Sequence, residues 1–162
     1  MSVNGLPEQV SAPPESYLRL RRAWQAGDQI SLRLDMTPRW TYPDPRVDAV
    51  RGCVAIERGP LVYCFEQADQ PVPVDELTVA GGAPLTERDA TLPGVGRTVE
   101  VTVPARHRAH DFAGTAWSGR PAPAGTSAGG GQQALTATAI PYFQWDNRGP
   151  GAMRVWLPAV GT

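Results

Sequence analysis

The chain has 162 residues, which is enough for one domain, or for one domain with part of another. Its composition, 41% hydrophobic and 19% charged, is that of a soluble globular protein and excludes a disordered chain. A formal net charge of −1 excludes long-range attraction to nucleic acid or to an anionic membrane, and no apolar run approaches the ~20 residues of a membrane span.

The first predicted element is a β-hairpin over residues 17–36. Leu18 and Leu20 alternate with arginines, and after a polar turn at residues 25–28 the apolar positions run from Ile30 to Met36 in steps of two. Such alternation predicts strands with one face in a core and the other in water. The proline-rich stretch that follows, 37–51, predicts a stiff connector and a domain boundary near residue 38.

The stretch 53–66 is the densest apolar run, and only Arg58, Gly59 and Pro60 interrupt it. A hairpin with Arg58 and Gly59 at its tip would pair Glu57 with Pro60, which has no N–H to donate. A long strand that bends at Gly59 and Pro60 avoids this loss, so we predict a bent strand.

The two cysteines test that choice. In a bent strand, Cys53 and Cys64 lie about 36 Å apart at ~3.3 Å per residue, so we predict free thiols. In the alternative hairpin they would face each other and could form a disulfide.

The rest of the chain predicts short strands at 74–79, 97–103, 135–140 and 152–157, separated by a loop at 80–96, a flexible loop at 104–133 and a turn at 147–151. No amphipathic helix stands out. The chain is therefore predicted to be all-β, with residues 39–160 forming an antiparallel β-sandwich of jelly-roll-like or immunoglobulin-like type.

Three stretches carry a family resemblance: 17–36, 51–64 and 140–158. Together they resemble the C-terminal β-sandwich region of glycoside hydrolase family 127, which contains the β-L-arabinofuranosidases. The resemblance implies that residues 1–38 are a β-hairpin left over from a preceding sandwich, whose earlier strands are missing. It also implies that the chain is a non-catalytic accessory domain beside the catalytic helical barrel of a parent that hydrolyses L-arabinofuranosides or related glycosides.

The family mechanism uses a cysteine nucleophile and zinc held by Glu and Cys ligands in that upstream barrel. Cys53 and Cys64 have no cysteine close by and lie in an apolar strand, so we assign them no catalytic role. His107, His110 and Asp111 are the only cluster of metal-ligand types, and we read them as a solvated loop. We therefore predict no catalytic residue, no metal site and no cofactor in this chain.

Carboxylate pairs for glycoside hydrolysis could be drawn from several acidic residues, none of which the sequence singles out: Glu57, Glu66, Asp69, Asp75, Glu76, Glu87, Asp89 and Glu100. The aromatic residues are better candidates for a functional site than these carboxylates. Trp117, Tyr142 and Trp145 could stack on sugar rings if exposed, which would make the chain an independent carbohydrate-binding module instead. Packing within the core or against another domain is the interpretation that we favour.

For partners we expect the catalytic barrel of the parent and a possible homodimer, and neither nucleic acid nor a membrane. The first five residues lack the basic and then apolar pattern of a signal peptide, which favours a cytoplasmic chain and leaves the export of a longer parent open.

The apolar side of the hairpin at 17–36 generates the first test. Burying each of its large side chains is worth roughly 1.5 to 3 kcal/mol, so we expect this side to dock on the C-terminal domain or on a second copy of the chain. Deleting residues 1–36 should lower the melting temperature or convert a dimer to a monomer. Differential scanning calorimetry and light scattering measure both, and a truncated protein that keeps both properties contradicts the prediction.

Overall fold

The computed structural model describes residues 1–9, 13, 16–108 and 133–160. The chain divides into two compact units, Met1–Asp35 and Met36–Thr162. In the described residues all regular structure is β-strand apart from four short 3₁₀ turns, so the all-β prediction is confirmed. None of these helical turns is long and apolar enough to cross a membrane.

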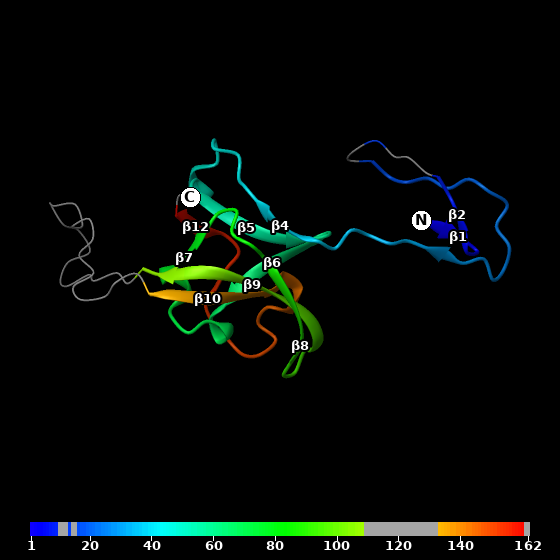
Figure 1. Cartoon of the computed structure of the whole chain (residues 1–162). Coiled ribbons are helices and arrows are strands. Elements are labelled where there is room, and N and C mark those ends of the chain that lie inside the picture. The colour runs from blue at the N-terminus through cyan, green and yellow to red at the C-terminus, as the bar shows by residue number, and fades with distance from the viewer. Residues whose placement is uncertain (10–12, 14–15, 109–132, 161–162) are drawn as a thin grey trace, which may run out of the picture. The chain divides into compact units, whose positions relative to one another are not determined.

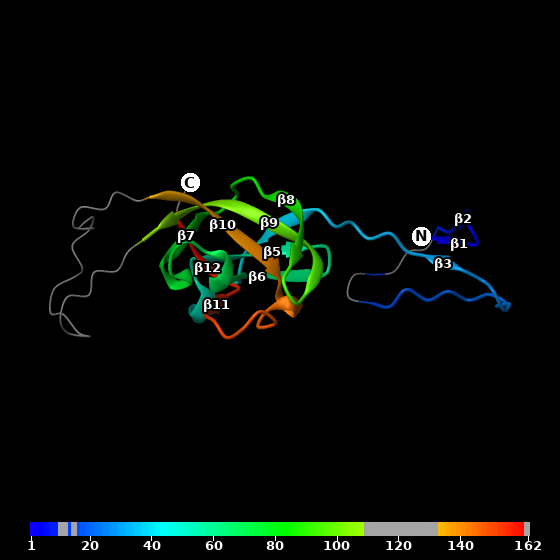
Figure 2. The same ribbon diagram turned by 90° about the horizontal axis from the view of Figure 1, so that it is seen from below.

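The larger unit is a closed β-barrel (Figures 1 and 2). Its ring contains β5 (Cys53–Arg58), β6 (Leu61–Glu66), β10 (Ala134–Pro141), β9 (Gly96–His107), β7 (Leu77–Ala80) and β12 (Leu157–Val160). Neighbours in this order are hydrogen-bonded, and β12 returns to β5. The β7–β12 pair is parallel, and the other pairs are antiparallel.

The predicted β-sandwich, jelly-roll-like or immunoglobulin-like, is therefore wrong. A sandwich needs two sheets that remain separate at their edges, whereas here β5 pairs with both β6 and β12 and leaves no gap in the ring. The short strand lengths and turn signals are common to both architectures. Only the pairing of strands distant in sequence, such as β7 with β12, distinguishes them.

Three further strands pair along the outside of the ring. β4 (Pro38–Thr41) pairs with β5, β8 (Thr86–Leu92) pairs with β9, and β11 (Met153–Arg154) pairs with β6. β4 lies in the predicted connector and β8 in the predicted loop at 80–96, so both predictions missed a strand. β8 exposes most of its side chains, and its sequence therefore lacks the apolar alternation that would reveal it.

The other predicted strands are present with shifted bounds. β9 runs on to His107, so the start of the predicted flexible loop is strand, and residues 109–132 of that loop lie outside the described residues. The predicted strand at 74–79 is a 3₁₀ turn, η3 (Val74–Glu76), followed by β7. The predicted strand at 152–157 is divided between β11 and β12.

The central stretch forms a hairpin, and the predicted bent strand is wrong. Arg58 pairs with Leu61, so Gly59 and Pro60 are both in the turn. The tip of this hairpin is shifted by one residue from that of the hairpin rejected above. Pro60 therefore lies in the turn, where no ladder hydrogen bond from its backbone nitrogen is needed. Gly59 has a φ of 56°, the positive value that the first position of a type II′ turn requires.

Every strand of the ring contributes side chains to one interior core. Tyr63 and Phe65 are its largest members and are fully buried, and the Tyr63 hydroxyl donates a hydrogen bond to the Val99 carbonyl at 2.9 Å. The buried core consists of Val54, Ile56, Tyr63, Phe65, Val74, Leu77, Val79, Val101, Val103, Ala105, Ala137, Ala139 and Leu157. Because side chains fill the interior, the barrel is a packed core and not a container for a ligand.

The smaller unit has three two-residue strands, β1 (Ser2–Val3), β2 (Leu6–Pro7) and β3 (Ile30–Ser31), in the order β2-β1-β3. The predicted turn at 25–28 is present, with the Asp28 amide donating to the Gln25 carbonyl at 3.1 Å. Residues 17–21 form no strand, and β3 is all that remains of the second predicted strand, so the hairpin is mostly wrong. Its apolar side chains lack a covering layer: Ile30, Leu32 and Leu34 are 53%, 61% and 50% exposed.

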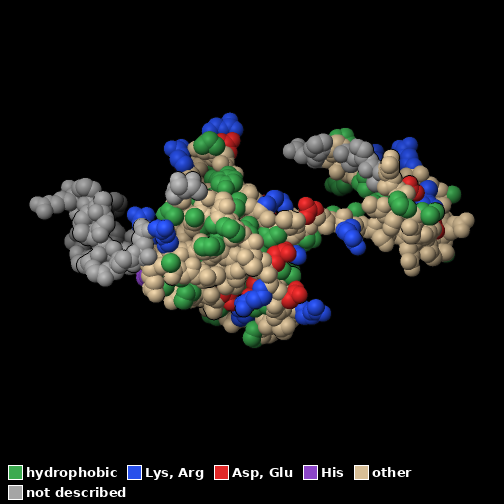
Figure 3. Space-filling view, viewed as in Figure 1, with side chains coloured by type: hydrophobic (Ala, Val, Ile, Leu, Met, Phe, Trp, Pro, Cys, Tyr) green, Lys and Arg blue, Asp and Glu red, His purple; other side chains and the backbone are tan. Residues whose placement is uncertain are grey.

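Both units carry exposed apolar side chains among their charged ones (Figure 3). Among the described residues of the barrel unit, the large exposed apolar ones are Tyr42, Val47, Val62, Tyr142 and Phe143. Val62 and Tyr142 line one groove on the outside of the ring, which is described below.

The turn at Gly59 generates the second test. Replacing Gly59 with Ala places a Cβ on a residue with positive φ, which costs roughly 1–2 kcal/mol or more in the free energy of unfolding. Gly81→Ala is a matched control, because φ of Gly81 is not positive and an added Cβ would meet its neighbours at an ordinary 3.7–3.8 Å. Urea unfolding of both variants measures the difference. Equal stability of the two would show that the turn does not need glycine.

Candidate functional site

The candidate site lies where β5 and β6 diverge. These strands pair only next to their turn, at Glu57 with Val62 and at Arg58 with Leu61. Beyond that point β12 pairs with β5 and β11 pairs with β6. Val155 and Trp156, which connect β11 to β12, therefore cross from one diverging strand to the other.

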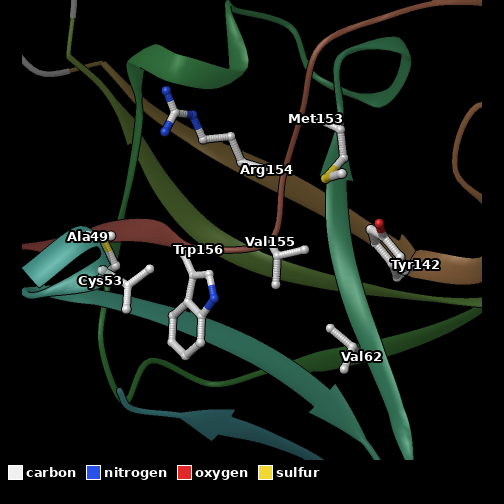
Figure 4. A pocket seen from close by; sticks show the side chains of 9 residues that line it. Ala49, Cys53, Val62, Tyr142, Met153, Arg154, Val155 and Trp156 are labelled. Atoms are coloured by element: carbon white, nitrogen blue, oxygen red, sulfur yellow. The ribbon is translucent and has the colours of Figure 1, made fainter. Parts of the chain in front are cut away.

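The outer side of this crossing is a groove of about 610 Å³, which we call the seam groove. It is lined by Ala49, Val50, Cys53, Val62, Tyr142, Met153, Arg154, Val155 and Trp156. Val155 and Trp156 lie between Ala49 and Cys53 on one side and Val62, Met153 and Tyr142 on the other (Figure 4).

Among the described residues that line the groove, Arg154 is the only charged one. It is exposed, and it forms no ion pair with any residue that the structure describes. Its guanidinium extends away from Val62 and Tyr142 (Figure 4). The groove is thus an apolar surface with one unneutralised positive charge at its edge.

Two of the three aromatic residues predicted to contact sugars lie together here. Tyr142 belongs to the 3₁₀ turn η4 (Tyr142–Gln144), and its ring stacks on that of Trp145 with centroids 6.0 Å apart. Tyr142 is 45% exposed, whereas the Trp145 Nε1 is buried and has no hydrogen-bond partner in the part of the chain that the structure describes. Trp117 lies outside the described residues. Trp156, which the sequence analysis did not propose, lies in the groove itself.

A second apolar cluster supports the groove from below. Cys64, Leu92 and Ile140 are buried on the outer side of the ring, and Trp145, Met153 and Val155 pack against them. Met153 and Val155 therefore have one side in this cluster and the other in the groove. Nothing in their sequence pattern reveals this double role, because it depends on β11 lying against β6.

A buried ion-pair cluster holds the turn before β11 in place. Arg148 bonds to Glu66 at the end of β6 and to Asp69 in η2 (Gln67–Asp69). The distance from Arg148 Nη1 to Asp69 Oδ1 is 2.6 Å. Its hydrogen bond to Asp69 and the one to Glu66 raise the pKa of Arg148, so the guanidinium stays charged. This cluster ties residues 145–151 to the ring and so positions the groove wall that follows them.

The two cysteines are both free and have different surroundings. Burial raises the pKa of the Cys64 thiol to about 12, which makes it unreactive at neutral pH. Cys53 is partly exposed and lines the seam groove. In the observed register Arg58 pairs with Leu61, and Cys53 pairs with Pro158 of β12, so the two cysteines do not face each other.

The acidic residues form no catalytic pair in the described part of the chain. Most of them are bound to an arginine: Glu57 to Arg39, Glu66 and Asp69 to Arg148, Glu87 to Arg58, and Glu100 to Arg88, while Glu76 bonds to His107. A carboxylate held in this way is a structural group and not a free acid or base. Asp75 and Asp89 have no such cation among these ion pairs, and no feature of the described structure brings them into the groove.

The described residues do not fit a zinc site. They contain no group of three or more His, Cys, Asp or Glu side chains that could hold a metal ion. His107 bonds to Glu76 at 2.5 Å, and the other members of its predicted cluster, His110 and Asp111, lie outside the described residues. We therefore derive no chemical step through zinc from this chain.

Comparison with known proteins assigns the family. Residues 38–158 match the C-terminal domain of glycoside hydrolase family 127, and residues 1–36 match the middle domain of the family 127 β-L-arabinofuranosidases. The chain belongs to glycoside hydrolase family 127. The resemblance noted from three sequence stretches is thereby confirmed, and the two matched regions meet close to the division between the two structural units.

The relatives are much longer than this chain. It is 34% identical to a non-reducing end β-L-arabinofuranosidase of Bifidobacterium longum subsp. longum, over 96% of this chain and 23% of the relative. A solved family 127 β-arabinofuranosidase aligns with a TM-score of 0.73 at 31% identity, over 98% of this chain and 23% of that one. A solved β-L-arabinofuranosidase of Geobacillus stearothermophilus T6 aligns with a TM-score of 0.69 at 29% identity, over 98% of this chain and 24% of that one. The family 127 chain thus spans about a quarter of these relatives.

The Arg148 cluster generates the third test. Arg148→Met leaves Glu66, which is 1% exposed, without its cation, and breaking a buried pair in this way costs about 3 kcal/mol in the free energy of unfolding. The exposed pair of Arg46 with Asp44 supplies the control, because Arg46→Met should change stability by less than about 1 kcal/mol. Chemical denaturation of both variants gives the comparison. A loss below about 1 kcal/mol for Arg148→Met would contradict a stabilising role of the cluster.

Proposed function

We propose that this chain is the non-catalytic accessory part of a family 127 glycoside hydrolase and that its barrel braces the catalytic domain of that enzyme. The observation that supports this most directly is the double family match: its two regions match a middle and a C-terminal domain, and together span about a quarter of the relatives. The parent would hydrolyse L-arabinofuranosides, as the names of the relatives indicate for those proteins.

The chemistry of the described residues supports the same assignment. The barrel interior is filled with apolar side chains, and most acidic residues are bound to a cation. Hydrolysis of a glycoside requires a nucleophile or an activated water together with a proton donor at the scissile bond. The partly exposed Cys53 lies in an apolar groove where no described acid or base contacts it. This chain therefore contributes structure to the enzyme.

The proposal predicts that the purified chain does not release nitrophenol from an aryl β-L-arabinofuranoside above the uncatalysed rate, with the Bifidobacterium longum relative as the positive control. Turnover that is lost in Cys53→Ala or Cys64→Ala would contradict it, because the activity would then depend on the chain's own thiols. The assay is read by absorbance at constant pH.

A further inference from the structure

We propose that the seam groove is the surface through which this barrel docks on the catalytic domain of the same polypeptide. The inference rests on the function proposed above and goes further by naming the face and the kind of surface that covers it. The partner surface would carry an apolar side chain that enters the groove and a carboxylate that reaches Arg154.

The groove has the features of a docking surface and not of an incomplete core. The interior of the ring is already closed and packed, so the apolar lining of the groove serves nothing inside the barrel. Its lining includes exposed side chains, since Val62 is 41% exposed and Tyr142 45%. Contiguous exposed apolar surface of this kind marks a site where another molecule binds.

The lining favours a protein surface over a sugar. Most of its side chains are apolar, and apart from the Arg154 guanidinium only the Tyr142 hydroxyl, the Trp156 indole N–H and the Cys53 thiol carry polar atoms. A sugar presents several hydroxyl groups, and most of them would lose hydrogen bonds to water without finding partners here. An apolar side chain from another domain has no such cost.

The charge of the groove defines the partner further. Arg154 has no acidic partner among the described residues, and no Asp or Glu lines the groove. A guanidinium at the edge of an apolar contact gains most from a carboxylate, which it can bind with two parallel hydrogen bonds. The partner is therefore expected to place an Asp or Glu beside its apolar side chain.

The length of the relatives indicates where this partner lies. About three quarters of each relative falls outside the region that this chain matches, and it belongs to the same polypeptide. Domains joined in one chain meet at a high effective concentration, so a modest apolar groove is enough to hold them together. A freely diffusing partner would need a larger surface.

Cys53 provides a direct reporter of groove access. Its thiol lines the groove and is partly exposed, whereas Cys64 is buried and serves as an internal control that should not react in the folded protein. The experiment compares the rate of iodoacetamide labelling at Cys53, quantified on its peptide by mass spectrometry. One sample is the free chain, and the other is a chimera in which this chain replaces the aligned segment of the Bifidobacterium longum enzyme.

We expect Cys53 to react at least tenfold more slowly in the chimera than in the free chain. Val62→Arg places a charge in the groove opposite Glu57, and Arg154→Glu reverses the charge at its edge, so each should restore labelling to within about twofold of its own free-chain rate. Thr86→Arg on β8, which contributes no lining residue, is the matched control and should leave Cys53 protected.

Equal labelling rates in the two wild-type samples would overturn the inference. So would protection of Cys53 in the free chain by an arabinofuranosyl oligosaccharide, which would make the groove a glycan site. If the chimera does not fold, the free chain is mixed with the Bifidobacterium longum enzyme lacking its aligned segment, and the same peptide is quantified. The proposed function fails separately, when the free chain itself hydrolyses the aryl arabinofuranoside.

Discussion

The closure of the ring at the β5–β6 hairpin is the constraint on which the rest of this structure depends. The turn at Gly59 and Pro60 brings two strongly apolar strands together, so that Tyr63 and Phe65 enter the same interior as Ile56. With β12 on the other side of β5, no strand of the ring keeps a free edge toward a second sheet. The interior of this ring is filled by its own side chains, so a binding site on the barrel would lie on its outer surface.

The same hairpin creates the groove. β5 and β6 are held together only near their turn, and β11 and β12 pair with them where they separate. The two residues that connect β11 to β12 must then cross the gap, which exposes the outward side chains around them. The separation of β5 from β6 beyond their turn therefore allows β12 to complete the ring and also forms the groove.

Charged groups stabilise this arrangement. The buried Glu66 requires a cation, and Arg148 supplies it from the turn that leads into β11. At the other end of the ring, Arg58 bonds to Glu87 of β8, which ties the outer strand to the hairpin. Because burial makes an unpaired carboxylate costly, the Arg148–Glu66 pair helps to attach the turn before β11 to the ring, whereas the Glu87 side chain is 42% exposed and its pair contributes less.

The all-β class, the family, the approximate position of most strands and the apolar character of residues 53–66 could be predicted from the amino-acid sequence. These properties are local, since alternation, turn residues and long motifs can each be read within a few positions. The sequence did not reveal β8, whose exposed side chains leave no apolar pattern, and it favoured a bend at Gly59 and Pro60 where the chain makes a turn. The choice between a sandwich and a barrel, and the meeting of Cys53, Tyr142 and Trp156 at one groove, became visible in the folded chain. Both depend on pairings between strands that are distant in sequence, and the two-residue alternation of a strand is the same whichever strand becomes its neighbour.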